Sequence, residues 1–228
     1  MTIKIQKEVW SILIVTGLLC VLCVVLGSAI KKSNPSEKPK GLANLGLIIV
    51  NFFNGLVETN MGIEYVNFLS PVIGTIGMYI LTANLIGLFA IPNPTANFSV
   101  TLTMAFFAWL VIEGTQIKVK GAKGFFGGLF EPFALFLPVN IFGELSPLLS
   151  LSMRLFGNIL VGGVLMQLVY AGTSLLSGLI PVIGKQFNIF GPVFAPLLHA
   201  YFDVFSGVIQ MYIFIMLTTV LAKSKADS

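Results

Sequence analysis

The length of its apolar runs constrains this chain more than any other feature of the sequence. Several runs in its 228 residues reach the roughly 20 apolar residues with which an α-helix crosses a bilayer. Hydrophobic residues make up 56% of the chain and charged residues only 10%, whereas a soluble domain carries about 25% charged residues. The sequence therefore predicts an all-α integral membrane protein.

The runs divide one membrane domain, residues 1–228, into six segments. We expect a span at 10–30, an interfacial helix at 42–57, spans at 68–91 and 98–117, and two long blocks at 125–180 and 187–222. Segment 42–57 is apolar but contains three asparagines, which favours a position at the membrane surface. The basic stretch 118–124 is expected to be a loop. The first run predicts a retained anchor, because it is long enough to span and lysines follow it; cleavage as a signal peptide after "GSA" is the alternative.

Block 125–180 is too long for one perpendicular helix. Its 56 residues would extend on the order of 80 Å, against an apolar core of about 30 Å. The block must cross twice, or be broken, steeply tilted or partly flat in the membrane. Pro132, Pro138 and Pro147 provide possible breaks near its start.

The lysines indicate how often the chain crosses. They gather after the first span, after residue 117 and at the C-terminus. Five crossings with the N-terminus outside place 9 of the 13 basic residues in the cytoplasm, whereas a sixth would export the C-terminal lysines. We therefore predict five crossing helices and one interfacial helix, with the last two helices long and strongly tilted.

The last two blocks contain an unusual number of polar groups. Arg154 is the only arginine in the chain, and Asn158 lies on the same helical face four residues later. Small residues accompany this pair and would allow a close approach by another helix: Gly157, Gly162 and Gly163. In the final block, one predicted stripe contains His199, Asp203, Ser206 and Gln210. Gln167 has no partner in either stripe and is interpreted as a contact between helices.

Two interpretations of Arg154 remain open from the residues alone. Ionisable groups inside membranes usually face protein or water and often mark ion paths. Arginine stays charged in poor solvent, so it could form a fixed positive barrier in such a path. Alternatively, it forms a structural ion pair with Asp203 or Glu144. If neither carboxylate satisfies Arg154, another subunit must.

Other chemistries find little support. Cys20 and Cys23 lie in mid-span and read as ordinary apolar positions, and no helix offers His and Glu at metal-ligand spacing. The phosphate-binding pattern GxxxxGK[ST] is absent from the sequence, and the lysines form no aromatic-interleaved patch for nucleic acid. A hydrolase using His199 and Asp203 would lack a plausible nucleophile. We expect no cofactor, no metal and no catalytic activity of the chain itself.

Several stretches resemble one known family. "SLSMRLFGNILVGG", "FLPVNIFGELSPLLSLSMRLFGN" and the later "FSGVIQMYIFIMLTTVLA" are similar to subunit a of F-type ATP synthases, across roughly residues 65–225. The resemblance implies a membrane stator beside a rotating ring of c subunits, with five crossing helices and one interfacial helix. It also implies a peripheral stalk of subunit b, the other synthase subunits and membrane lipid as partners.

The resemblance assigns roles to individual positions. Arg154 matches the arginine that separates two aqueous half-channels and faces the c-ring carboxylates. Asn158 matches a residue that lines the path, Gln210 a residue near the arginine, and Glu144 an acidic residue at the cytoplasmic exit. Gly157, Gly162 and Gly207 are expected at the c-ring interface, and His199, Asp203 and Ser206 in the ion path.

This chain departs from the family at three positions. Gly163 stands where many relatives carry Glu, Asp203 where others carry His or Glu, and Asn97 where Asp is frequent. We therefore expect Asp203 to be the main titratable group of the outer half-channel. The moving ion is expected to be H⁺ rather than Na⁺, and the location a bacterial plasma membrane. The competing hypothesis is a secondary transporter or ion channel that acts alone.

Overall fold

The computed structural model describes residues 7–33, 39–89, 91–130, 133–179, 188 and 190–227. The regular structure of this part is helical: α1 (Lys7–Lys32), α2 (Leu42–Met61), α3 (Ile63–Leu85), α4 (Phe98–Gly128), α5 (Leu137–Gly178), α6 (Gly191–His199) and α7 (Ser206–Asp227). Short 3₁₀ turns are η1 (Ile86–Phe89), η2 (Pro94–Ala96) and η3 (Ala134–Phe136). A π-helical segment, η4 (Ala200–Phe205), joins α6 to α7 without a break.

Six helices in the described residues are long and apolar enough to cross a membrane, when α6 to α7 is taken as one. This confirms the prediction of an all-α integral membrane protein. The division into five crossing helices and one interfacial helix stays a prediction, because α2 also meets the length and hydropathy expected of a span.

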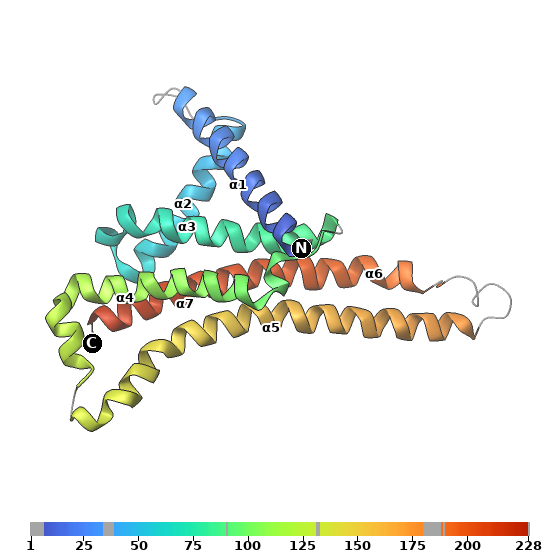
Figure 1. Ribbon diagram of the computed structural model, residues 1–228. Helices are drawn as coiled ribbons and strands as arrows, with labels where there is room; N and C mark the ends of the chain where they lie inside the picture. The colour runs from blue at the N-terminus through green and yellow to red at the C-terminus, as the bar shows by residue number, and fades with distance from the viewer. Residues whose placement is uncertain are drawn as a thin grey trace, which may run out of the picture.

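The helices form a layer with a hairpin rising from it. In Figure 1, α3, α4, α5 and the continuous α6–α7 rod lie side by side, while α1 and α2 leave this layer at a steep angle. The chain turns sharply from α2 into α3 at Gly62, whose φ of 103° suits a residue without a Cβ. Apolar side chains from α2, α3, α4, α5 and α7 meet in one core, which includes Phe53, Ile73, Ile112, Leu155 and Phe214.

The basic stretch 118–124 is not a loop, contrary to the prediction. Helical turns lie on both sides of Gly121 and extend to Gly128, but the backbone of Gly121 itself is not helical (φ 74°, ψ 162°), so that two helical pieces meet there at a kink. Lysine and alanine favour helix on both sides of this glycine, so that the helical conformation resumes after the kink and the stretch does not become a loop.

The block predicted at 125–180 begins later than expected. Residues 125–128 belong to α4, and α5 is one helix of 42 residues that starts at Leu137. It is roughly 60 Å long, twice the thickness of an apolar bilayer core. Pro138 lies in its first turn and Pro147 inside it; Figure 1 shows α5 bending in its early, yellow part. Three further features of the prediction lie outside the described residues: the break at Pro132, the end of the first long block at residue 180 and the start of the second at residue 187.

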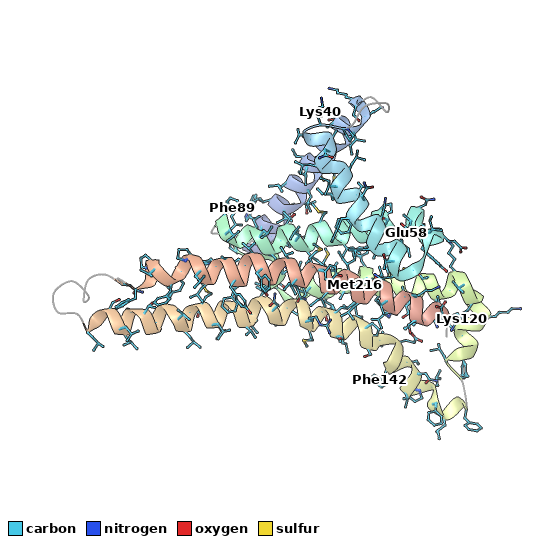
Figure 2. All side chains as sticks on the ribbon, turned by 180° about the vertical axis from the view of Figure 1, so that it is seen from behind. Lys40, Glu58, Phe89, Lys120, Phe142 and Met216 are labelled. Carbon is cyan, nitrogen blue, oxygen red and sulfur yellow. The ribbon has the colours of Figure 1, made fainter. Side chains whose placement is uncertain are left out.

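Many charged side chains gather where several helix ends meet. Figure 2, the view from behind, places Glu58 and Lys120 at this end and Lys40 at the tip of the α1–α2 hairpin. Lys118 from α4 also reaches the Phe68 ring of α3, with its Nζ 5.0 Å from the ring centroid. The end of α4 therefore lies beside the start of α3.

Candidate functional site

Arg154 lies on the outward face of α5. Its neighbours Leu151, Ser152 and Leu155 are buried, whereas Met153 and Arg154 are exposed. This alternation follows from helical geometry, because α5 presents one face to the core and the opposite face outward. Among the described residues, Arg154 makes no hydrogen bond and no ion pair.

The two carboxylates that could have paired with Arg154 are engaged elsewhere. Asp203 Oδ2 lies 2.6 Å from His199 Nδ1. Glu144 forms an ion pair with Lys225 from the last turn of α7. The alternative of a structural ion pair between Arg154 and Asp203 or Glu144 is therefore wrong within the described part of the chain.

A chain of three titratable side chains joins α5 to the final rod. Tyr170 Oη lies 3.1 Å from His199 Nε2, and the other ring nitrogen of His199 faces Asp203. The side chain of His199 is 41% exposed and that of Asp203 20% exposed. These contacts provide a continuous hydrogen-bonded route between groups that can gain or lose a proton.

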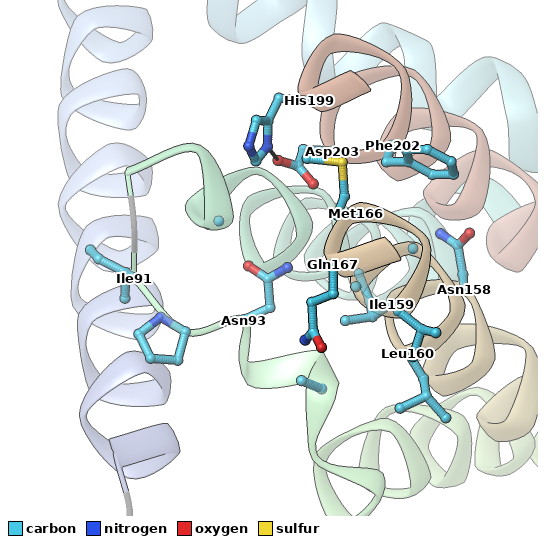
Figure 3. Close-up of a pocket in the computed structure, with 16 residues that line it drawn as sticks. Ile91, Asn93, Asn158, Ile159, Leu160, Met166, Gln167, His199, Phe202 and Asp203 are labelled. Atoms are coloured by element: carbon cyan, nitrogen blue, oxygen red, sulfur yellow. Dashed lines mark hydrogen bonds and ion pairs between the residues drawn. The ribbon is translucent and has the colours of Figure 1, made fainter. Parts of the chain in front are cut away.

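A cavity of about 450 Å³ lies beside this chain. Its polar lining comes from three parts of the fold: Asn93 after α3, Asn158 and Gln167 on α5, and His199 and Asp203 on the final rod. Figure 3 shows these polar groups around one space, with apolar groups such as Ile91, Met166 and Phe202 completing the wall. Most of the cavity wall is apolar, but five polar side chains point to one space that is large enough to hold several water molecules.

The predicted stripe of His199, Asp203, Ser206 and Gln210 does not stay on one face. The prediction assumed regular α-helical spacing, but the π-helical segment adds residues per turn and rotates α7 relative to α6. Ser206 Oγ donates to Asn158 Oδ1 at 2.8 Å and thus ties α7 to α5. Gln210 is buried in the core instead, and its Nε2 has no hydrogen-bond partner among the described residues.

The glycines predicted at the c-ring interface fall into different environments. At Gly157 and Gly163 an added Cβ would meet no atom within 4 Å. Gly163 lines the cavity, whereas Gly157 leaves room on α5 for another chain. Gly162 faces Phe202 and lines the cavity. Gly207 packs inward, because a Cβ there would lie 3.1 Å from Asn84 Cβ of α3. The structure therefore removes Gly207 from the outward face.

A second polar cluster lies at the charged end of the molecule. Lys225 Nζ contacts Glu113 Oε1 of α4 at 2.6 Å and also Glu144 Oε2 of α5. Trp109 Nε1 of α4 donates to the backbone oxygen of Glu144 at 2.7 Å. Glu144 thus lies where three helices converge, near the bend of α5.

Sequence reasoning did not assign Tyr170, Gln167, Asn93, Glu113, Trp109 or Lys225 to these two sites. Tyr170 and Gln167 follow Gly163 at positions i+7 and i+4, so that helical spacing alone could have placed them on one face. Asn93 and Lys225 carry no such signal, because only the packing of distant segments brings them to the cavity and to Glu144.

Together these features define a class of protein: a polytopic α-helical membrane protein with two internal polar clusters and, between them, an outward-facing cation that has no partner among the described residues. Residues 9–223 match the family model described as ATP synthase A chain. The chain belongs to the family of ATP synthase subunit a, a non-catalytic membrane subunit of that complex, which confirms the expected family and the expectation that the chain is not itself an enzyme.

Curated relatives agree with this assignment. The chain is 34% identical over 200 residues to "ATP synthase subunit a" of Oceanobacillus iheyensis, covering 84% of this chain and 80% of that protein. It is 35% identical over 164 residues to "ATP synthase subunit a, sodium ion specific" of Propionigenium modestum, covering 65% and 51%. It is 29% identical over 238 residues to "ATP synthase subunit a 2" of Chlorobaculum tepidum, covering 99% and 65%.

The chain thus spans about half the length of the Propionigenium modestum relative and about two thirds of that from Chlorobaculum tepidum. The relatives are bacterial, and with the six apolar helices they support a multi-pass protein of the plasma membrane.

Proposed function

We propose that this chain is the ion-conducting stator subunit of an F-type ATP synthase. In this function two aqueous half-channels lead to the carboxylates of the c-ring, and Arg154 separates them. The proposed partners are the c-ring, the peripheral stalk of subunit b, the other synthase subunits and membrane lipid.

Arg154 is exposed and has no ion pair in the part of the chain that the structure describes, and this observation carries the proposal. An arginine cannot lose its charge in an apolar environment, and an isolated charge there is costly. Asp203 and Glu144 are engaged with His199 and Lys225, and no carboxylate of the described residues pairs with Arg154. We therefore propose that the counter-charge comes from another chain. A ring whose carboxylates pass one after another would provide a counter-charge that arrives and leaves.

Arg154 can act on such a carboxylate in two ways. A nearby cation favours the ionised form, so that a carboxylate entering this position releases its ion. The same fixed charge repels a cation that would otherwise pass directly between the half-channels. Both effects need a charge that stays on the face toward the ring, and Arg154 lies on an exposed face of α5.

The cavity lined by Asn158, His199 and Asp203 is the proposed outer half-channel, with Ser206 bonded to its wall. The cluster around Glu144 is the proposed inner exit. We propose the proton as the moving ion, because Tyr170, His199 and Asp203 form a hydrogen-bonded series of titratable groups. The proposed orientation has the N-terminus outside and the C-terminus in the cytoplasm, as the lysine distribution favours.

The test uses the complete ATP synthase reconstituted in vesicles. Arg154→Ala should abolish ATP-driven proton pumping while the chain still assembles. Lys223→Gln is the control for loss of one positive charge, because Lys223 pairs at the surface with Asp227. Normal pumping by Arg154→Ala would refute the role of Arg154.

A second experiment separates the stator from a transporter that acts alone. The purified chain in vesicles, without a c-ring, should conduct no protons. Sustained flux from the chain alone would favour the transporter or channel hypothesis.

A further inference from the structure

The cluster of Lys225, Glu113 and Glu144 is the feature that the proposed function leaves least explained. In the proposed function only Glu144 has a role. Glu113 on α4 and Lys225 in the last turn of α7 have none, although both contact this cluster. The side chains of Glu113, Lys225 and Glu144 are only 5%, 18% and 23% exposed. Figure 1 shows the end of α7 lying beside α4, which brings these distant residues together.

The charges of this cluster do not balance. Two carboxylates contact one ammonium group, so that full ionisation gives these three side chains a net charge of −1 in a largely buried place. Such a charge is unfavourable at low exposure unless a cation or a proton compensates it.

Some hydrogen-bond acceptors in and beside the cluster have no donor among the described residues. Glu113 Oε2 is buried and has no hydrogen-bond partner among the described residues. One turn further along α4, the buried Gln116 Oε1 is another acceptor without a partner in the described part. Residues three positions apart lie on the same helical face, so that α4 presents two vacant acceptors on one side.

We infer that Glu113 is a second proton acceptor of the inner exit and that Lys225 is the positioning residue that holds it beside Glu144. This inference rests on the proposed function and extends it by two residues of this chain. The proton released by a c-ring carboxylate forms an O–H bond with Glu113 or Glu144. That bond then breaks as the proton passes to water on the inner side, and Lys225 keeps its own proton throughout.

Lys225 is suited to this role by its place in the fold. Without the ammonium group, two carboxylates from α4 and α5 would face each other and repel at close range. With it, both remain oriented toward one point at the meeting of three helices. Trp109 further fixes α5 at this point through the backbone of Glu144.

The test measures passive proton flux through the assembled membrane sector, expressed per complex. Glu113→Gln keeps the size of the side chain and should lower this flux by about tenfold or more, as expected when a positioned proton-transfer group is lost. Lys225→Gln should lower the proton flux at least as much, whereas Lys225→Arg should retain most of it. The double variant Glu113→Gln with Lys225→Gln should conduct better than Lys225→Gln alone, because it lacks the repulsion between two carboxylates. Lys223→Gln, two residues away and paired at the surface, should behave like the wild type.

A purely structural cluster gives a different result. The variants would then assemble in smaller amounts, but the flux per assembled complex would be unchanged, which would overturn the inference. If Lys225→Gln does not assemble, Glu113→Gln alone still decides between the two outcomes. Arg154→Ala in the same vesicles distinguishes failure of the proposed function from failure of this inference. Normal pumping by Arg154→Ala refutes the proposed function. If Arg154→Ala abolishes pumping but Glu113→Gln leaves the flux unchanged, only this inference is refuted.

Discussion

Gly207 offers a sharp test of how α7 is oriented. Substitution by alanine adds a Cβ 3.1 Å from Asn84 Cβ, closer than the roughly 3.5–4.0 Å of an ordinary carbon contact. Asn84 Cβ is fixed by its backbone and cannot rotate away. Its amide donates to the Gly207 carbonyl oxygen and accepts from Thr95 Oγ1, in a residue only 1% exposed. The strain must therefore separate α7 from α3 or break these bonds.

The size of the effect follows from two opposing contributions. Overpacking a core costs about 1–3 kcal/mol of the free energy of unfolding. Replacing glycine by alanine within a helix stabilises by about 0.5–1 kcal/mol. Gly157→Ala contains only the second contribution, since nothing lies within 4 Å of the added Cβ. Gly207→Ala should thus be less stable than Gly157→Ala by about 1–3 kcal/mol.

The assay is thermal unfolding of the purified chain in detergent, without a c-ring. At about 2–4 °C per kcal/mol for a protein of this size, Gly207→Ala should unfold several degrees below Gly157→Ala. Equal or higher stability of Gly207→Ala would refute the inward packing of α7 on Asn84. The result would then favour the predicted place of Gly207 on the face toward the ring.

Three further predictions concern individual backbone contacts. Asn97→Ala removes the side-chain acceptor of the Ser99 N–H at 2.9 Å and should lower the free energy of unfolding by about 1 kcal/mol; Asn97→Asp should retain it, and equal melting of both variants would contradict the cap. Trp109→Phe leaves the Glu144 carbonyl without its indole donor, so amide hydrogen exchange should become faster around the bend of α5. Unchanged exchange would show that this hydrogen bond does not stabilise the backbone of α5 at the bend. Gly121→Ala forces a side chain onto a φ of 74° and a ψ of 162° and should destabilise by about 1–3 kcal/mol or straighten α4, as measured by spin-label distances across the kink. A wild-type distance together with wild-type stability would contradict this.

The elements of the fold were largely predictable, because membrane-length apolar runs leave a chain few structures other than helices. The breaks between them were less predictable. Gly121 only kinks α4 and Pro147 only bends α5, although both residue types often end helices. Whether such a residue ends a helix depends on the neighbouring helices, which Trp109 illustrates by binding the backbone of α5 near the bend.

The candidate site shows the same division. Arg154 and Asn158 were recognisable by their spacing, as was the contact between His199 and Asp203 four residues apart. The position of Gln210 was not, because the π-helical segment before it changes the register of α7.

The membrane environment, the helical class and the unusual cost of placing Arg154 in an apolar region were all predictable from the amino-acid sequence. These follow from composition and local spacing, which need no knowledge of distant contacts. The lack of an ion pair at Arg154 within the described residues could not be predicted in this way, since it depends on where Asp203 and Glu144 find their partners in the folded chain. The tertiary structure also turned Gly207 inward and brought Lys225 to Glu113, across more than a hundred residues of chain. Long-range packing alone sets such distances, and so it alone shows which charges remain for another subunit to satisfy.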